Sequence, residues 1–162
     1  MGPQYTGGSK LVLPKDYREW TFLTSGLGMS YTPGAKDAAN PSFDNVFVNP
    51  AAYQAFLKTG TWPDKTVLIL EVRGSENHTS ITTAGRSQNT VMAVEAHVKD
   101  ASHGGWAFYA FGTGQEGALL PKTQDCYSCH EQNGAVDTTF AQYYPTLVDV
   151  AKAKGTFKGG SH

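Results

Sequence analysis

The spacing of apolar residues along the chain predicts a domain rich in β-strands. Residues 66–73 are dominated by β-branched and other apolar residues, and residues 106–111 repeat their apolar positions with a period of two. In residues 89–99 the even positions are mostly apolar, whereas the odd positions hold Glu95 and His97. Two shorter strands are predicted at residues 20–23 and 46–48.

Helix signals are fewer. Asn49 as N-cap, Pro50 at the first helical position and Gly60 just past the end predict one helix. A second helix is expected from about Asp137 to Lys154, and Pro145 should kink or split it. Residues 14–17 can open a short helical turn, and loops are expected at 25–42, 74–88 and 112–125.

This order of elements favours an α+β domain, with a predominantly antiparallel sheet, a few helices and a helix near the C-terminus. A chain of 162 residues with 40% hydrophobic residues is long enough for one well-packed core. We expect residues 1–10 to be a flexible N-terminus, 11–155 to be the single domain and 156–162 to be a flexible tail.

Charge and hydropathy exclude two classes of partner. The formal net charge is −1 and the sequence has no cluster of Lys and Arg, so nucleic-acid binding is not expected. No apolar run approaches the ~20 residues that span a bilayer. The first residues lack the features of a signal peptide, so an exported protein would be represented here by its mature or trimmed chain.

The two cysteines carry the strongest chemical signal. Cys126-Tyr127-Ser128-Cys129-His130 is a C-x-x-C-H motif, the attachment signature of haem c. Two thiols at this spacing can each form a thioether with one haem vinyl group, and the adjacent His130 can then bind the iron. The sequence therefore predicts one covalently attached haem c, held by Cys126 and Cys129, with His130 as the proximal ligand.

Two other uses of a C-x-x-C motif fit this sequence less well. A thioredoxin-like dithiol normally follows a strand within a βαβ unit, whereas this motif follows a predicted loop late in the chain. A zinc site would need a second pair of ligands. The other histidines are scattered along the sequence: His78, His97, His103 and His162.

The chain resembles the cytochrome P-460 and cytochrome c′-β family from about residue 10 to residue 154. Besides the haem motif, the resemblance rests on the order and spacing of several blocks. They are Leu13-Pro14-Lys15-Asp16-Tyr17-Arg18-Glu19-Trp20, Val46-Phe47-Val48-Asn49-Pro50, Thr59-Gly60-Thr61-Trp62-Pro63-Asp64, Val98-Lys99-Asp100, Trp106-Ala107-Phe108 and Phe140-Ala141-Gln142-Tyr143-Tyr144-Pro145.

The resemblance implies a mostly antiparallel β-fold, one haem c with an open or water-filled sixth position, and a homodimer. The P-460 branch oxidises hydroxylamine and carries an additional link from a Lys to the porphyrin. The c′-β branch lacks the link, has an apolar distal pocket and binds gases such as nitric oxide.

Three positions are assigned by this resemblance. The crosslinking Lys aligns with Leu70, which cannot form the link, and a family Arg near the distal pocket aligns with Asp44. Lys65 is the nearest alternative, but an odd number of residues separates it from Leu70, so it should face the other side of the sheet. The distal carboxylate that relays protons aligns with Glu95, whose alternative role is that of a polar residue on a half-exposed strand.

Other distal candidates carry weaker signals. Met29 and Met92 are possible sixth ligands, although Met92 lies on the apolar face and is expected in the core. Three phenylalanines are candidates to crowd the distal side, but core packing is the favoured interpretation for each of them: Phe43, Phe47 and Phe56. The histidines at 78, 97 and 103 are expected at the surface or in contact with the residues that bind the haem.

Three functions remain in competition. The favoured prediction is a periplasmic cytochrome that binds nitric oxide or a related small ligand. The second is an enzyme that oxidises hydroxylamine with Glu95 as proton acceptor. The third is simple electron transfer with a partner protein, which would require a six-coordinate iron.

Overall fold

The computed structural model describes residues 2–77 and 79–159. His78, His162 and the last part of the expected tail (160–162) lie outside the described residues. Within the described part, no helix has the length and apolar character needed to cross a membrane.

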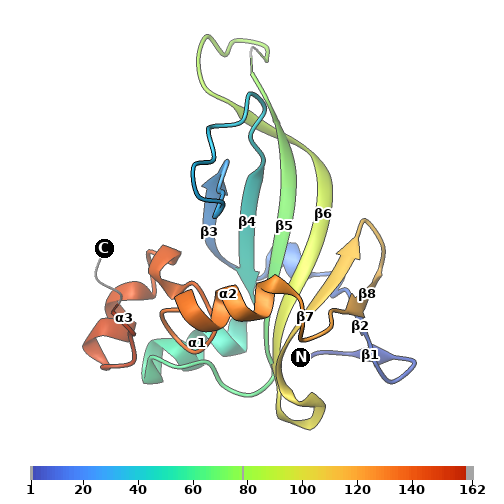
Figure 1. Ribbon diagram of the computed structural model, residues 1–162, viewed down its shortest axis with the longest axis vertical. Coiled ribbons are helices and arrows are strands. Elements are labelled where there is room, and N and C mark those ends of the chain that lie inside the picture. Colours follow the sequence, from blue (N-terminus) through green and yellow to red (C-terminus); the bar gives the residue numbers. More distant parts are fainter. Residues whose placement is uncertain (1, 78, 160–162) are drawn as a thin grey trace.

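The described strands form one twisted antiparallel sheet (Figure 1), in the order β1-β2-β8-β7-β6-β5-β4-β3. β5 and β6 are the longest strands and lie near its centre. The strands are β1 (Tyr5–Thr6), β2 (Lys10–Val12), β3 (Thr21–Leu27), β4 (Phe43–Val48), β5 (Thr66–Glu76), β6 (Ser87–Asp100), β7 (Gly105–Gly112) and β8 (Glu116–Leu119). The predicted α+β class and antiparallel sheet are confirmed.

Each of the five predicted strands is present, and most are longer than expected. The expected loop at 112–125 is partly wrong, because it contains β8, which pairs with both β7 and β2. Residues 1–10, expected to be flexible, contribute β1 and the first residue of β2 to the edge of the sheet. β1 pairs with its neighbour β2, and β2 in turn pairs with β8, which lies about 100 residues later in the chain and is not indicated by any local sequence pattern.

The first predicted helix is confirmed as α1 (Pro50–Thr59). Gly60 ends it with a φ of 72°, and its amide donates to the Phe56 carbonyl. The second predicted helix is wrong as a continuous element. Its range contains a tight turn, a 3₁₀ turn called η3 (Ala141–Tyr143) and only one α-helix, α3 (Val148–Ala153), and Pro145 separates the two helical pieces.

The haem motif lies on another helix, α2 (Asp125–Asn133). Further 3₁₀ turns are η1 (Tyr17–Glu19) and η2 (Ala101–His103). Past α3, the Thr156 hydroxyl donates to the Gly60 carbonyl and the Lys158 amide donates to the Ala135 carbonyl, so the described part of the expected tail packs against the domain.

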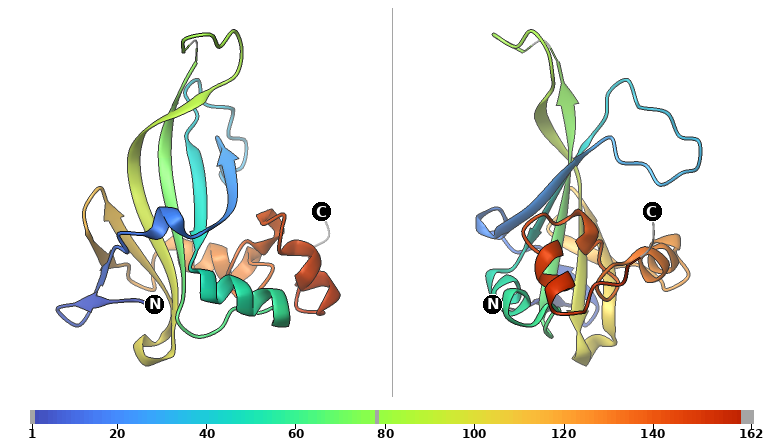
Figure 2. Two further views of the ribbon diagram at one scale, coloured as in Figure 1. Left: turned by 180° about the vertical axis from the view of Figure 1, so that it is seen from behind. Right: turned by 90° about the vertical axis from the view of Figure 1, so that its left-hand side faces the viewer.

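The sheet separates two hydrophobic cores. Figure 2 shows α2 and the 28–42 loop projecting from one face, which we call the front, while η1 crosses the other face, the back. Leu68 on β5 belongs to the front core with residues of α1 and α3, whereas Val67 and Ile69 belong to the back core. This is the expected alternation of strand side chains.

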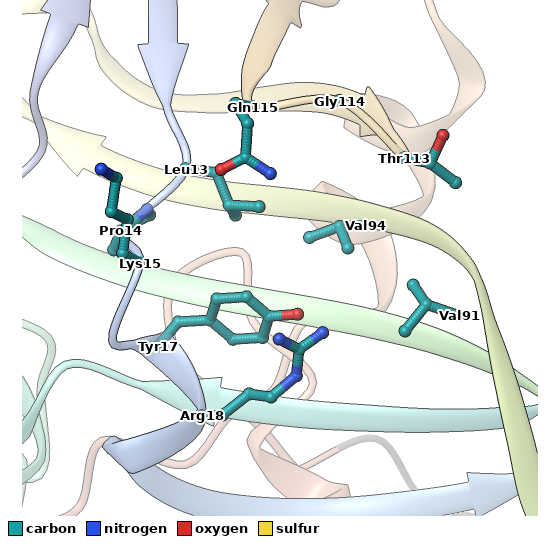
Figure 3. A pocket seen from close by; sticks show the side chains of 10 residues that line it. All are labelled: Leu13, Pro14, Lys15, Tyr17, Arg18, Val91, Val94, Thr113, Gly114 and Gln115. Carbon is teal, nitrogen blue, oxygen red and sulfur yellow. The ribbon is translucent and has the colours of Figure 1, made fainter.

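The back face holds a cavity of about 350 Å³ that Tyr17 and Arg18 help to line (Figure 3), and both of these residues bond the buried carboxylate of Glu71. Glu71 is 2% exposed, and its carboxylate accepts hydrogen bonds from the Tyr17 hydroxyl and from Arg18 and Arg73. Burial by itself raises the pKa of Glu71, but these hydrogen bonds outweigh it and hold the pKa below its usual value. Burial, together with the bond to Glu71, raises the pKa of Tyr17 to about 12.

We predict that Glu71→Ala lowers the free energy of unfolding by about 2 kcal/mol, because it leaves the buried Tyr17 hydroxyl without its acceptor and removes the partner of two partly exposed guanidinium groups. A carboxyl whose folded pKa is lowered stabilises the protein fully above its unfolded pKa of about 4.3. The stabilisation is lost as the pH falls through the lower folded value. Urea unfolding of the native chain and the variant, at neutral pH and in acid, measures both effects.

Glu116→Ala is the matched control, because Glu116 pairs with Lys10 at an exposed site. It should change the unfolding free energy little. Equal effects of the two substitutions would contradict the assigned role of Glu71.

Candidate functional site

The front face contains a cavity of about 500 Å³, bounded by the sheet, α2, η3 and the segments that flank them. This volume lies within the range of sites for small molecules and cofactors. The side chains that line it come from segments far apart in sequence: Thr24, Ser25, Gly26, Met29, Tyr31, Asp44, Val46, Leu68, Leu70, Glu95, Ala96, His97, Phe108, Cys126, Cys129, His130, Phe140, Tyr143 and Tyr144.

α2 brings the three functional residues of the motif to this cavity. Cys126 lies three positions before Cys129 and four before His130 on the same helix, so its side chain is on the same side as theirs. All three residues line the cavity. Both cysteines are free and half-buried. Burial, with smaller contributions from Glu95 and Asp125, raises the pKa of the Cys126 thiol.

The His130 imidazole is oriented by a backbone carbonyl. Its Nδ1 lies 2.7 Å from the Thr138 oxygen. Because a carbonyl can only accept, Nδ1 carries the proton and Nε2 keeps its lone pair. Burial lowers the pKa of His130, an effect that the bond to Thr138 partly offsets, so the ring is neutral as a metal ligand must be.

The turn that follows α2 provides this carbonyl. Gly134 ends the helix, and a Cβ at this position would lie 2.6 Å from the His130 carbonyl oxygen and 2.9 Å from Thr138. A glycine therefore lets residues 135–139 fold back against the helix end. Asp137, with a φ of 50°, completes the turn, and Val136 and Thr139 form a β-bridge across it.

Two carboxylates face the cavity from the sheet. In the register, Leu70 on β5 lies between Val46 on β4 and Glu95 on β6, and Asp44 precedes Val46 by two positions. Burial raises the pKa of Glu95. Burial, and then repulsion by Glu95, raises the pKa of Asp44. The structure thus brings together all three positions assigned by resemblance, and the predicted shared face of Glu95 and His97 is confirmed.

Lys65 lies outside the cavity, in agreement with its odd spacing from Leu70. Its ammonium bonds the carboxylate of Asp100 and the hydroxyl of Ser102. His103 also bonds Asp100, so it belongs to this group and not to the cavity. No lysine or arginine lines the cavity in the described part of the chain.

Phe43, Phe47 and Phe56 do not line the cavity, which contradicts the less favoured interpretation that they crowd the distal side. Phe43 and Phe47 alternate with the cavity-facing Asp44 and Val46, and Phe47 packs against the back core. Phe56 lies in the front core, with its ring centroid 4.4 Å from that of Trp62.

Different aromatic residues contact His130. Phe140 stacks on its ring at a centroid distance of 4.0 Å, and Phe108 lies at 4.7 Å. Phe140 and Phe108 both occur in blocks of the family resemblance, but only the fold shows that they meet. Thr138 has no sequence signal, because it contacts His130 through its backbone carbonyl.

The two methionine candidates differ in position. Met29 lines the cavity from the 28–42 loop. Met92 is 58% exposed and does not line the cavity, so its expected place in the core is wrong. The pairing register shifts at this point, because Ala93 pairs with Val72 and Val91 with Arg73, which leaves Met92 without a partner on β5.

The cavity fits a haem better than the other uses of a C-x-x-C motif. Cysteines of redox dithiols have lowered pKa values, whereas that of Cys126 is raised. Among the described residues, no group of three or more His, Cys, Asp or Glu side chains is arranged to hold a metal ion. A haem needs only the two thiols, one imidazole and an adjoining cavity with apolar walls, and all of these are present.

Comparison with known families agrees with this geometry. The family model for cytochrome P460 matches residues 14–141. The chain belongs to the cytochrome P460 family. Membership implies a haem cofactor, and the matched range includes the whole sheet from β3 onward, α2 and the turn that contacts His130. A search of curated proteins finds no match to the chain.

Proposed function

We propose that this cytochrome P460 family member binds nitric oxide or a related small nitrogen-oxide ligand at one covalently attached haem c. Cys126 and Cys129 form the thioethers, each thiol adding across one vinyl group, and His130 provides the proximal ligand through Nε2. When bound, the haem supplies an iron that coordinates a small exogenous ligand. The observation that carries the proposal is the single cavity shared by these three side chains and the front face of the sheet.

The surroundings of the cavity favour an iron with an open sixth position. His97 is the other imidazole that lines the cavity, but its ring lies 5.1 Å from that of His130 and its Nε2 is 3.2 Å from the Thr138 hydroxyl. It is therefore on the side of the proximal ligand and already has a hydrogen-bond partner. Met29 remains the candidate sixth ligand that an electron-transfer cytochrome would require.

The absence of a lysine from the described cavity lining supports the c′-β-like form without a porphyrin crosslink. Leu70 occupies the aligned position and offers no nucleophile. Attachment of haem c takes place where thiols are managed outside the reducing cytoplasm, so the proposal places the protein in the periplasm. A homodimer is part of the same proposal, on the strength of the family resemblance.

The first test is an optical spectrum of the holoprotein before and after nitric oxide addition, with Met29→Ala as the matched variant. We expect high-spin spectra with an ordinary Soret position, a clear change on nitric oxide addition, and the same behaviour in Met29→Ala. A low-spin spectrum that becomes high-spin in Met29→Ala would instead support electron transfer. A strongly red-shifted ferrous Soret band would indicate a crosslink and contradict the assignment of Leu70.

Covalent attachment is tested by the mass of the denatured chain. The native chain should retain the mass of one haem, because its only two cysteines both form thioethers. Each of Cys126→Ala and Cys129→Ala should hold the haem by one bond, and the double variant should lose it on denaturation. A haem that is extracted from the native chain, or retained by the double variant, would overturn the assignment.

The carboxylates favour a second candidate function, the oxidation of hydroxylamine. Glu95 and Asp44 line the cavity, and both have raised pKa values. A carboxylate in such surroundings can accept a proton from a bound N–H or O–H group at a pH close to neutral. Nitric oxide carries no proton, so the two functions make different demands on Glu95.

If this second function operates, Glu95→Gln should lower hydroxylamine turnover by about 100-fold and leave nitric oxide affinity unchanged. Because the working form is deprotonated and its pKa is raised, turnover in the native protein should increase with pH through a value above the usual 4.3. Steady-state kinetics with an electron acceptor measure both effects. Equal turnover in the native protein and the variant would leave Glu95 without a role in proton transfer.

A further inference from the structure

We propose that His97 is a positioning residue for the proximal ligand, acting on His130 through Thr138. The proposal rests on the proposed function, because it takes His130 to be the residue that binds the haem iron. It assigns a role to a buried histidine that neither attachment nor ligand binding requires.

His97 is held firmly at the base of the cavity. It is 8% exposed, and its ring stacks on Phe108 at a centroid distance of 4.0 Å and an interplanar angle of 13°. Trp106 covers it at 4.4 Å. These contacts leave the ring little freedom, so the direction of its Nε2 is fixed by the sheet.

Thr138 connects His97 to His130 through two different groups. Its hydroxyl lies 3.2 Å from His97 Nε2, and its carbonyl accepts the hydrogen bond from His130 Nδ1 at 2.7 Å. A residue bound at both its side chain and its carbonyl cannot rotate without breaking one contact. The rigid sheet thereby determines where the carbonyl that orients His130 lies.

The rest of the turn is tied on other sides, which leaves His97 to fix Thr138 itself. Trp62 donates to the Thr139 hydroxyl at 2.8 Å, and Lys99 pairs with Asp137 at 3.0 Å. The side chain of Thr138 contacts the sheet by a hydrogen bond to His97. Loss of this bond should therefore loosen the Thr138 carbonyl more than it loosens the turn.

The consequence for the haem follows from the chemistry of histidine ligands. A hydrogen bond from Nδ1 to an acceptor fixes the tautomer, orients the ring and increases the electron density that Nε2 offers to a metal. A weaker bond to Thr138 should thus weaken the iron–histidine bond and favour the ferrous state. A histidine that served only to fill the core would have neither effect.

Thr138→Val tests the proposal with little change in shape, and Thr138→Ser, which retains the hydroxyl, is the matched control. In the ferrous protein we expect Thr138→Val to shift the iron–histidine stretching band to lower frequency and the midpoint potential to a higher value. Thr138→Ser should keep both near the native values. Resonance Raman spectroscopy and redox titration measure them.

His97→Gln and His97→Leu complete the test, because glutamine can still bond the hydroxyl and leucine cannot. His97→Leu should reproduce the shifts of Thr138→Val and add little to them in the double variant, whereas His97→Gln should recover part of the native values. If His97→Leu fails to fold, the Thr138→Val and His97→Gln variants still test the proposal. An iron–histidine band and a midpoint potential in Thr138→Val equal to those of the native protein would overturn the proposal. The absence of an iron–histidine band from the native ferrous protein would instead overturn the proposed function.

Discussion

The antiparallel pairing of β5 with β6 determines the chemistry of both faces of the sheet. It places Leu70 opposite Glu95 and Leu68 opposite His97, and these four side chains face the cavity. The intervening positions point to the back, where Glu71 is buried among its donors. A shift of one residue in this register would exchange the two sets, because successive strand residues point to opposite faces.

This register is strictly required, because the buried residues of each face would be destabilised in the surroundings of the other face. Glu71 is stabilised by two guanidinium groups and a phenol, and no arginine lines the described front cavity. Glu95 has no such partners, and burial raises its pKa. Two glutamates 24 positions apart in sequence therefore have pKa values shifted in opposite directions, for reasons that lie in the register.

The sequence was informative wherever the determining interaction is local. Apolar residues at every second position predicted the central strands, and a proline and a glycine predicted the ends of α1. Because Glu95 and His97 are two positions apart on β6, the sequence also placed them correctly on the same face. It failed where the determining interaction is distant. β8 exists because β7 and β2 flank it. The sequence left open which side Phe43, Phe47 and Phe56 face: two of them alternate with Asp44 and Val46, and the third packs on Trp62.

The candidate site divides in the same way. A five-residue motif was sufficient to predict Cys126, Cys129 and His130 as a group. The contacts around His130 were not predictable, because Phe108 and Phe140 converge from β7 and η3, and Thr138 contributes its carbonyl, which every residue type possesses. Gly134 was visible in the sequence, but the turn between α2 and η3 that it helps to shape depends on Trp62 and Lys99 from elsewhere in the chain.

The residue at position 70 connects the two candidate functions. Leu70 is the cross-strand neighbour of Glu95, so its apolar side chain helps to keep water from the carboxylate. A lysine at this position, as the family resemblance leads one to expect in the crosslinked branch, would place a cation beside Glu95 before any link formed. It would lower the pKa of the carboxylate and favour the deprotonated base. With leucine, the raised pKa makes the Glu95 carboxylate a stronger base once it is deprotonated, but a smaller fraction of it is deprotonated in acid. The residue at position 70 therefore bears on two requirements of the second candidate function: the crosslink, and the pH above which Glu95 can accept a proton.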